Sequence, residues 1–141
     1  MGGGTVLRAS LFVGAMLALC ACGRPARLDT ANAGDDGINA YPSNYKSEIL
    51  SAMHAYLNDP TGIRDAAIAE PALKPTGAGG TTRYVACLKF NSKKNATEYA
   101  GVKEIAAIFL AGRFDQFNET PREQCVGAAY SPFPELQKLP P

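Results

Sequence analysis

The sequence predicts an α+β domain in which one N-terminal amphipathic helix packs on a small antiparallel β-meander, followed by a short C-terminal helix and an extended tail. Three observations support this fold class: an early stretch with helical spacing of apolar residues, several short apolar runs separated by Gly, Pro and Asn, and a helix-capping pattern near the C-terminus. A helix followed by consecutive strands buries one face of the sheet. We therefore expect a sandwich of two layers.

The helix is predicted over residues 44–58, with Ser43 as its N-cap. Apolar side chains recur in it at spacings of three and four: Ile49, Leu50, Met53, Tyr56 and Leu57. Pro60 ends it, because proline cannot continue the hydrogen-bond ladder and restricts the residue before it.

Four short runs after the helix are predicted to form strands. Residues 63–69 are a weak candidate because alanine has a low strand propensity, whereas 84–90 is apolar on both faces and should be a central strand. Residues 105–111 form a third apolar run, and a turn at Gly112-Arg113 can lead into a partner strand over 114–117. These runs together predict the meander.

Two loops separate these strands. The first, 71–80, contains Gly77-x-Gly79-Gly80, which matches neither phosphate-loop pattern, so we interpret it as a flexible hairpin loop. The second, 91–102, carries Tyr99, which can either contact a partner or pack on its own sheet. Two glycosylation spellings, at Asn95 and Asn118, are attributed to chance.

A capping box marks the predicted C-terminal helix. Thr120 is its N-cap, Pro121 takes the first helical position and Glu123 completes the box, so a short helix is expected over 121–128. The proline-rich residues from 130 onward are predicted to form an extended, polyproline-like tail. We expect its apolar side chains to dock on the domain, with recognition of another protein as the alternative.

Four residues near the start, Leu19-Cys20-Ala21-Cys22, resemble the lipobox of bacterial lipoprotein precursors. They follow one positive charge, Arg8, and an apolar stretch over 11–19, as in a secretory signal peptide. Cys22 is the predicted lipidation site because small Ala21 precedes it, whereas bulky Leu19 precedes Cys20. A transmembrane anchor is the alternative, but the apolar stretch is about half of the ~20 residues needed to span a bilayer.

The resemblance to lipoproteins implies a signal peptide over 1–21, a flexible tether over 22–42 and a single α+β envelope domain over 43–141. It also implies attachment to the lipid bilayer through the acylated N-terminus. Gly23 is not the Asp that retains such proteins at the inner membrane of enteric bacteria, so we expect the outer membrane, with the domain facing the periplasm.

The two cysteines beyond the lipobox, Cys87 and Cys125, are predicted to form a disulfide, because an exported domain folds in an oxidising compartment. A catalytic thiol or a metal pair is the alternative. Both would need a histidine, a CxxC spacing or further ligands that the sequence does not supply at a recognisable spacing.

Charge gives little support to other sites. The chain has 14 basic and 13 acidic residues, and removal of 1–21 takes away Arg8 alone, leaving 13 of each. This balance predicts no nucleic-acid partner. Lys93 and Lys94, with Lys103 nearby, are interpreted as a solvated loop rather than an anion site. The single histidine, His54, is interpreted as a helical residue at the boundary between core and solvent rather than a general base or metal ligand.

The residues from Tyr41 onward, including Asn58-Asp59-Pro60, Gly112-Arg113 and the region from Cys125 to Pro134, resemble the small lipoproteins of unassigned role in alphaproteobacterial envelopes. At coarser grain, a tethered helix and meander is similar to the small lipoprotein of the outer-membrane protein assembly machine, although that family has two helices before its strands. The resemblance implies localisation and fold only.

We expect no enzyme and no cofactor, because the sequence has no GxSxG pattern that would place a nucleophile beside an activating group. The predicted function is a non-catalytic binding or scaffolding module whose partner is an unknown envelope protein or wall component. The alternative is an inhibitor or immunity-type lipoprotein that blocks an envelope hydrolase with a protruding loop.

Overall fold

The structure is a computed structural model that describes residues 37–77 and 81–141. Within these residues the chain is α+β, with an antiparallel sheet of six strands and two helices. Their order is α1 (Tyr45–Tyr56), β1 (Arg64–Ala69), β2 (Ala72–Pro75), β3 (Thr82–Lys93), β4 (Tyr99–Leu110), β5 (Arg113–Asn118), β6 (Tyr130–Pro132) and α2 (Pro134–Gln137). The predicted signal peptide and tether residues 22–36 lie outside the described residues.

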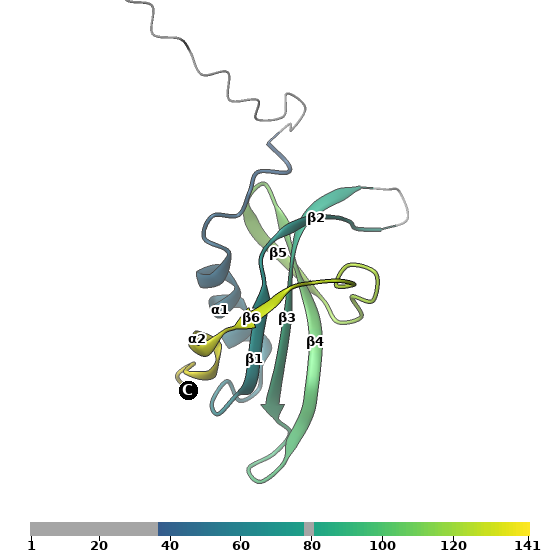
Figure 1. Cartoon of the computed structure of the whole chain (residues 1–141). Helices are drawn as coiled ribbons and strands as arrows, with labels where there is room; N and C mark the ends of the chain where they lie inside the picture. The colour runs from purple at the N-terminus through teal and green to yellow at the C-terminus, as the bar shows by residue number, and fades with distance from the viewer. Residues whose placement is uncertain (1–36, 78–80) are drawn as a thin grey trace, which may run out of the picture. The chain divides into compact units, whose positions relative to one another are not determined.

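The sheet has the strand order β5-β4-β3-β1-β6, and β2 pairs with β3 beside this path. β2 pairs with the first residues of β3, from Pro75 opposite Thr82 to Ala72 opposite Val85. β1 pairs with the later residues of β3, from Leu88 to Asn91. β1 and β2 therefore lie along the same side of β3 as one interrupted strand (Figure 1). The long hairpin of β3 and β4 forms the centre of the sheet.

Strand β2 corrects the prediction of a loop over 71–80. The amide of Thr76 donates to the carbonyl of Thr81 at 2.7 Å, so these opposed residues form a hydrogen-bonded pair. Hydrogen-bonded and non-hydrogen-bonded pairs alternate along an antiparallel ladder. The backbone N and C=O groups of Pro71, Leu73 and Pro75 therefore point away from β3, toward the free edge of the sheet. The prolines that suggested a loop have no N–H to donate there, so they are compatible with an edge strand and protect it from strand addition.

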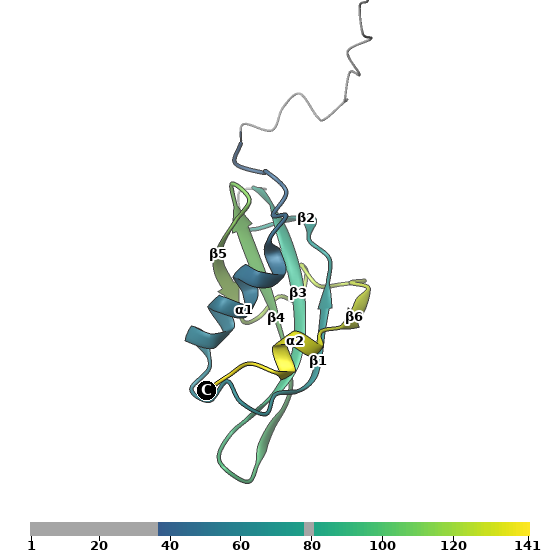
Figure 2. The ribbon, with the colours of Figure 1, turned by 90° about the vertical axis from the view of Figure 1, so that its left-hand side faces the viewer.

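The helices cover one face of the sheet (Figure 2). Helix α1 occupies most of the predicted range 44–58 and buries Ile49 and Met53 completely. Its N-cap is Asn44 and not the predicted Ser43, and no side chain among the described residues caps it. On the strands, the same face carries the predicted alternate side chains of β3, including Leu88 and Phe90. These residues share one core with Ile105, Phe109, Phe133 and Leu136, among others.

The predicted helix over 121–128 is not formed; the chain makes a turn there. The side chain of Thr120 does not cap a helix, because its hydroxyl and its amide both donate to Oδ1 of Asn118. The amide of Cys125 donates to the carbonyl of Pro121 at 3.0 Å, which closes a single turn. The capping signal is thus satisfied locally, while the disulfide of Cys125 fixes the path of the chain.

The tail also differs from the extended form that was predicted. Residues 130–132 add strand β6 to β1, and 134–137 form helix α2, which begins at Pro134 as proline favours. The predicted docking is confirmed, since Phe133 and Leu136 are fully buried in the core on the helical face.

The predicted tether ended at residue 42, but its last residues belong to the folded domain. The carbonyl of Ile38 accepts a hydrogen bond from the amide of Ala111 in the β4–β5 turn, at 2.8 Å. The rings of Tyr41 and Tyr84 meet edge to face, 5.2 Å apart. Packing against the domain therefore begins by residue 38. The prediction placed this boundary later because the segment remains polar and rich in glycine until the helical pattern starts.

Candidate functional site

The face of the sheet opposite the helices is crossed by the segment 119–129. Strands β5 and β6 lie at opposite edges of the sheet, so their connection must pass over one face. Figure 1 shows this segment on the side away from α1 and α2. We call this side the open face.

The predicted disulfide holds the crossing segment in place. Cys87 lies in the central strand β3 and is bonded to Cys125, with 5.7 Å between their Cα atoms. Cys87 and Cys125 share a small buried cluster with Ala69, Val85, Ala106 and Ile108. Because both thiols are consumed in the bond, neither is a nucleophile or a metal ligand in this state.

Above the crossing segment, the open face is hollowed into a groove of about 490 Å³. Its apolar lining comes from Ile108 and the exposed Leu110 of β4. Phe117 and Gly77 also line it, and the other lining residues are polar: Thr76, Thr81, Arg83, Asp115, Gln116, Asn118 and Gln124. A groove with an apolar floor and polar walls is suited to binding a ligand of mixed character.

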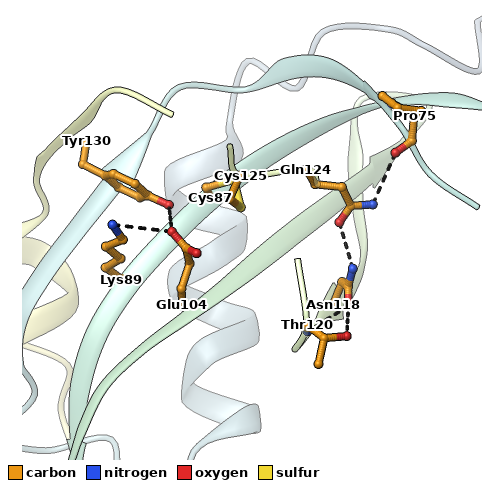
Figure 3. Close-up of a disulfide and its surroundings, with 9 residues drawn as sticks. All are labelled: Pro75, Cys87, Lys89, Glu104, Asn118, Thr120, Gln124, Cys125 and Tyr130. Carbon is orange, nitrogen blue, oxygen red and sulfur yellow. Dashed lines mark hydrogen bonds and ion pairs between the residues drawn. A yellow bond between two sulfur atoms is a disulfide. The ribbon is translucent and has the colours of Figure 1, made fainter. Parts of the chain in front are cut away.

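Gln124 separates this groove from a second hollow of about 340 Å³ beside the disulfide. Its side chain is buried and held by two contacts, accepting from Nδ2 of Asn118 at 2.8 Å and donating to the carbonyl of Pro75 at 3.5 Å (Figure 3). The second hollow is lined mainly by small residues, and the charged side chains of Glu70 and Lys74 also line it. Gln124 thus links the crossing segment to β5 and to β2.

Two cations stand side by side at the boundary of these hollows. Lys74 of β2 is directly opposite Arg83 of β3, so their side chains leave the same face of the sheet. Arg83 lines the groove and Lys74 the second hollow. Within residues 37–77 and 81–141, neither forms an ion pair. Arg83 donates to the carbonyl of Thr82 at 2.8 Å, and the like charges of Lys74 and Arg83, directly opposed on the sheet, are expected to destabilise it.

Farther down the open face, Tyr130, Lys89 and Glu104 form a closed cluster. The hydroxyl of Tyr130 donates to Oε1 of Glu104, which also pairs with Lys89 at 3.5 Å (Figure 3). The ammonium of Lys89 lies over the ring of Tyr130, 4.2 Å from its centre. Burial, and then the contact with Glu104, raise the pKa of Tyr130 far above its usual value. This cluster satisfies its own charges and fixes the end of the crossing segment.

The lysines of the predicted basic patch are brought near carboxylates on the helical side. Lys103 lies 3.1 Å from Glu119 and donates to the hydroxyl of Tyr56, which in turn donates to Glu119. The hydrogen bond from Tyr56, and then Lys103, lower the pKa of Glu119. Lys93 lies 3.7 Å from Asp59. Two of the three lysines are thus paired with carboxylates, but Lys93 lies in β3 and Lys103 in β4, so they do not belong to the solvated loop that was predicted.

The remaining candidates fall outside the groove. Tyr99 packs on its own domain, as one of its two interpretations held: its hydroxyl donates to the carbonyl of Gly62 and its ring stacks against Arg64. His54 lies exposed on α1, on the opposite side of the sheet from the groove. Cys22, the predicted lipidation site, lies outside the described residues.

The groove is lined by groups that can form hydrogen bonds and ion pairs. Its hydroxyls come from threonines, and its walls supply amides, one guanidinium and one carboxylate. Over the described part of the chain, no three His, Cys, Asp or Glu residues are grouped so that they could hold a metal ion. No helix in that part is long and apolar enough to cross a membrane.

No protein-family model, no curated protein and no solved structure matches this chain. The groove is therefore defined by its own geometry. Sequence reasoning missed Lys74, Arg83 and Gln124, because β2 was interpreted as a loop and the crossing segment as a helix. The signal that could have found the cations is the register: if Thr76 and Thr81 close a hairpin, Lys74 and Arg83 must face each other.

Proposed function

We propose that this protein is a lipid-anchored envelope lipoprotein whose domain binds an anionic, partly apolar segment of another envelope protein or of a wall component in the groove of the open face. In this proposal the domain is a binding or scaffolding module and not an enzyme. It is attached through Cys22 and faces the periplasm, at the outer membrane.

The observation that carries the proposal is the juxtaposition of Lys74 and Arg83 beside the apolar lining of the groove. Elsewhere in the domain, Lys89, Lys93, Lys103 and Arg113 each lie within 4 Å of a carboxylate, whereas Lys46, Arg64, Lys94, Arg122 and Lys138, like Lys74 and Arg83, form no ion pair among the described residues. What distinguishes Lys74 and Arg83 is that they are directly opposed on the sheet, where a bound carboxylate could pair with both. Ile108 and Leu110 would at the same time bury apolar surface of the ligand.

Site-specific photo-cross-linking tests this proposal in cells. A photoreactive amino acid is placed at Gln116 in the groove wall, at Ala96 in the β3–β4 turn, or at Ala55 on the outer side of α1; all three positions are exposed. We expect a discrete cross-linked partner from position 116 and none from position 55. Loss of that product in the Lys74→Gln, Arg83→Gln double variant would confirm the role of the cations. Equal products from 116 and 55 would contradict a groove-specific partner.

The anchor is tested separately with Cys22→Ser. We expect this variant to incorporate no labelled palmitate and to remain as an uncleaved or soluble precursor. Normal acylation of Cys22→Ser would overturn the assignment of Cys22.

The alternative, an inhibitor of an envelope hydrolase, is favoured by one observation. The turn between β3 and β4 is held by a dense set of hydrogen bonds in which Oδ1 of Asn95 accepts from the amides of Thr97 and Glu98. It lies at the end of the long central hairpin (Figure 1), and a stiff protruding turn is what blocking an enzyme cleft requires. A hydrolase cross-linked from position 96, and not from 116, would support this function instead.

A further inference from the structure

We propose that the end of the domain formed by Ile38, Tyr41 and Leu73 docks on the surface of the lipid bilayer, so that the domain is oriented on the membrane and not merely tethered to it. This inference rests on the proposed lipid anchor at Cys22. It adds a second, non-covalent contact with the membrane that the lipobox does not imply.

Exposed apolar residues are concentrated at this end of the domain. Of the six large apolar side chains that are exposed in the described residues, three lie here, Ile38, Tyr41 and Leu73, and a fourth, Leu110, lies next to them on the open face, where it lines the groove. They are connected through the fold, because Ile38 bonds to the turn that follows Leu110, and the ring of Tyr41 contacts Tyr84, which is opposite Leu73. The other two, Val102 and Val126, lie elsewhere.

The length of the chain before this end selects the bilayer as the occupant. Fourteen residues, 23–36, separate Cys22 from Gly37, where the described domain begins. Such a segment reaches roughly 50 Å when fully extended and about 20 Å as a flexible coil. The residues next to Gly37 are thus the part of the domain that the anchor keeps nearest to the lipid, at a high effective concentration.

The chemistry of the end fits the boundary between headgroups and acyl chains. Tyr41, 50% exposed, offers an amphipathic ring of the kind enriched at membrane interfaces, while Leu73 and Ile38, 47% and 45% exposed, offer aliphatic surface. The groove opens on a face of the sheet, to the side of this end. A docked domain would therefore hold the groove open to a partner at a fixed height above the membrane.

The absence of tryptophan from the whole sequence makes a direct test possible. Full-length lipidated protein carrying Tyr41→Trp is reconstituted into vesicles of phosphatidylethanolamine and phosphatidylglycerol at three to one, with or without brominated acyl chains. Leu73→Trp is a second reporter should Tyr41→Trp fold poorly. Val102→Trp is the matched control, because Val102 is 61% exposed and lies eight residues along β4 from Leu110, or roughly 26 Å.

We expect brominated lipid to quench the emission of Trp at position 41 or 73 by at least half and to leave position 102 unchanged. Adding Leu73→Glu to Tyr41→Trp should abolish the quenching while the protein still floats with the vesicles. Floating protein in which position 41 is no more quenched than position 102 would overturn docking and leave the anchor intact. Protein that does not float would overturn the anchor and, with it, the docking. Trp emission that is blue-shifted but not quenched, together with a cross-linked dimer, would show that a second copy of the protein covers this end instead of the bilayer, and would overturn the proposal.

Discussion

The two faces of the sheet are covered by different means. On the helical face, large side chains such as Phe90, Phe109 and Phe133 form one continuous core under α1 and α2. On the open face, a smaller cluster of mainly Ala, Val and Cys side chains lies under a crossing segment that is held by one disulfide and a few polar contacts. The difference shows that the helical face is stabilised mainly by packing of large apolar side chains, whereas the open face depends on a covalent bond and polar contacts.

The largest loss of stability is expected from a substitution in the core of the helical face. Phe109→Ala removes a fully buried ring and should lower the free energy of unfolding by roughly 3–5 kcal/mol, because burial is lost and a cavity remains. The neighbouring Ile108→Ala on the open face should cost less, about 2 kcal/mol, since Ile108 lines the groove. Urea unfolding of both variants measures the difference. Equal losses would show that the two faces are packed alike.

The disulfide is the corresponding test of the open face. Cys87 and Cys125 are 38 residues apart, so in the chain-entropy model their bond stabilises the fold by roughly 4 kcal/mol, less any strain. Cys87→Ala and Cys125→Ala should each cost a few kcal/mol, and the double variant little more than either one, because all three delete the same bond. Additive losses in denaturant unfolding would mean that the two residues act as separate buried side chains.

A tyrosine, a lysine and a glutamate meet on each face, which allows a matched comparison at high pH. Burial and Glu104 raise the pKa of Tyr130 in the fold, so the phenol titrates near pH ~10 only in the unfolded chain. Its contribution to stability is thus complete below pH ~10 and is lost as pH rises above it. The pKa of Tyr56 is also raised, by burial and then by Glu119, but Lys103 opposes that shift.

Tyr130→Phe should therefore make stability less sensitive to pH between 10 and 12, and Tyr56→Phe should do so to a smaller extent. At neutral pH, Tyr130→Phe should cost about 1 kcal/mol for the lost hydrogen bond to Glu104. Thermal unfolding followed at several pH values tests both expectations. An identical alkaline profile for wild type and Tyr130→Phe would show that this phenol is not held neutral by the fold.

The helical face was far easier to predict from sequence than the open face. Alternation and helical spacing identify side chains by their period, so α1, β3 and β5 were predicted close to their observed positions. Strand β4 was predicted over 105–111 but begins at Tyr99, so the predicted loop over 91–102 is wrong at both ends, where the polar residues continue the hairpin of β3 and β4. Cys87 and Cys125 were predicted as a bond from the compartment alone. Neither kind of reasoning says which face a long connection crosses, because that depends on β5 and β6 lying at opposite edges.

Local polar signals in this chain belong to turns. Asn95 and Asn118 each precede a threonine by two residues, and both accept a hydrogen bond from the amide of that threonine. Asp59 does the same with Thr61. The pattern that resembles a glycosylation signal is here a turn motif, in which the short side chain mimics a backbone carbonyl. The capping box at Thr120 was misinterpreted for the same reason, since Asn118 competes for its hydroxyl.

The smallest expected effect is a gain in stability and not a loss. Lys74→Gln and Arg83→Gln should each raise the free energy of unfolding by a few tenths of a kcal/mol, because like charges directly opposed across two strands repel. Lys89→Gln, on the same face, is the matched control: Lys89 is paired with Glu104, so its loss should lower stability slightly.

Added salt should shrink the gain at positions 74 and 83, as expected for exposed charges. If Lys74 and Arg83 lower the stability of the fold, their role is in binding and not in folding. These substitutions should then weaken cross-linking from position 116 while they stabilise the fold. If Lys74→Gln and Arg83→Gln are instead as destabilising as Lys89→Gln, the two cations contribute to the fold, and the groove loses the feature that marks it as a site for an anionic partner.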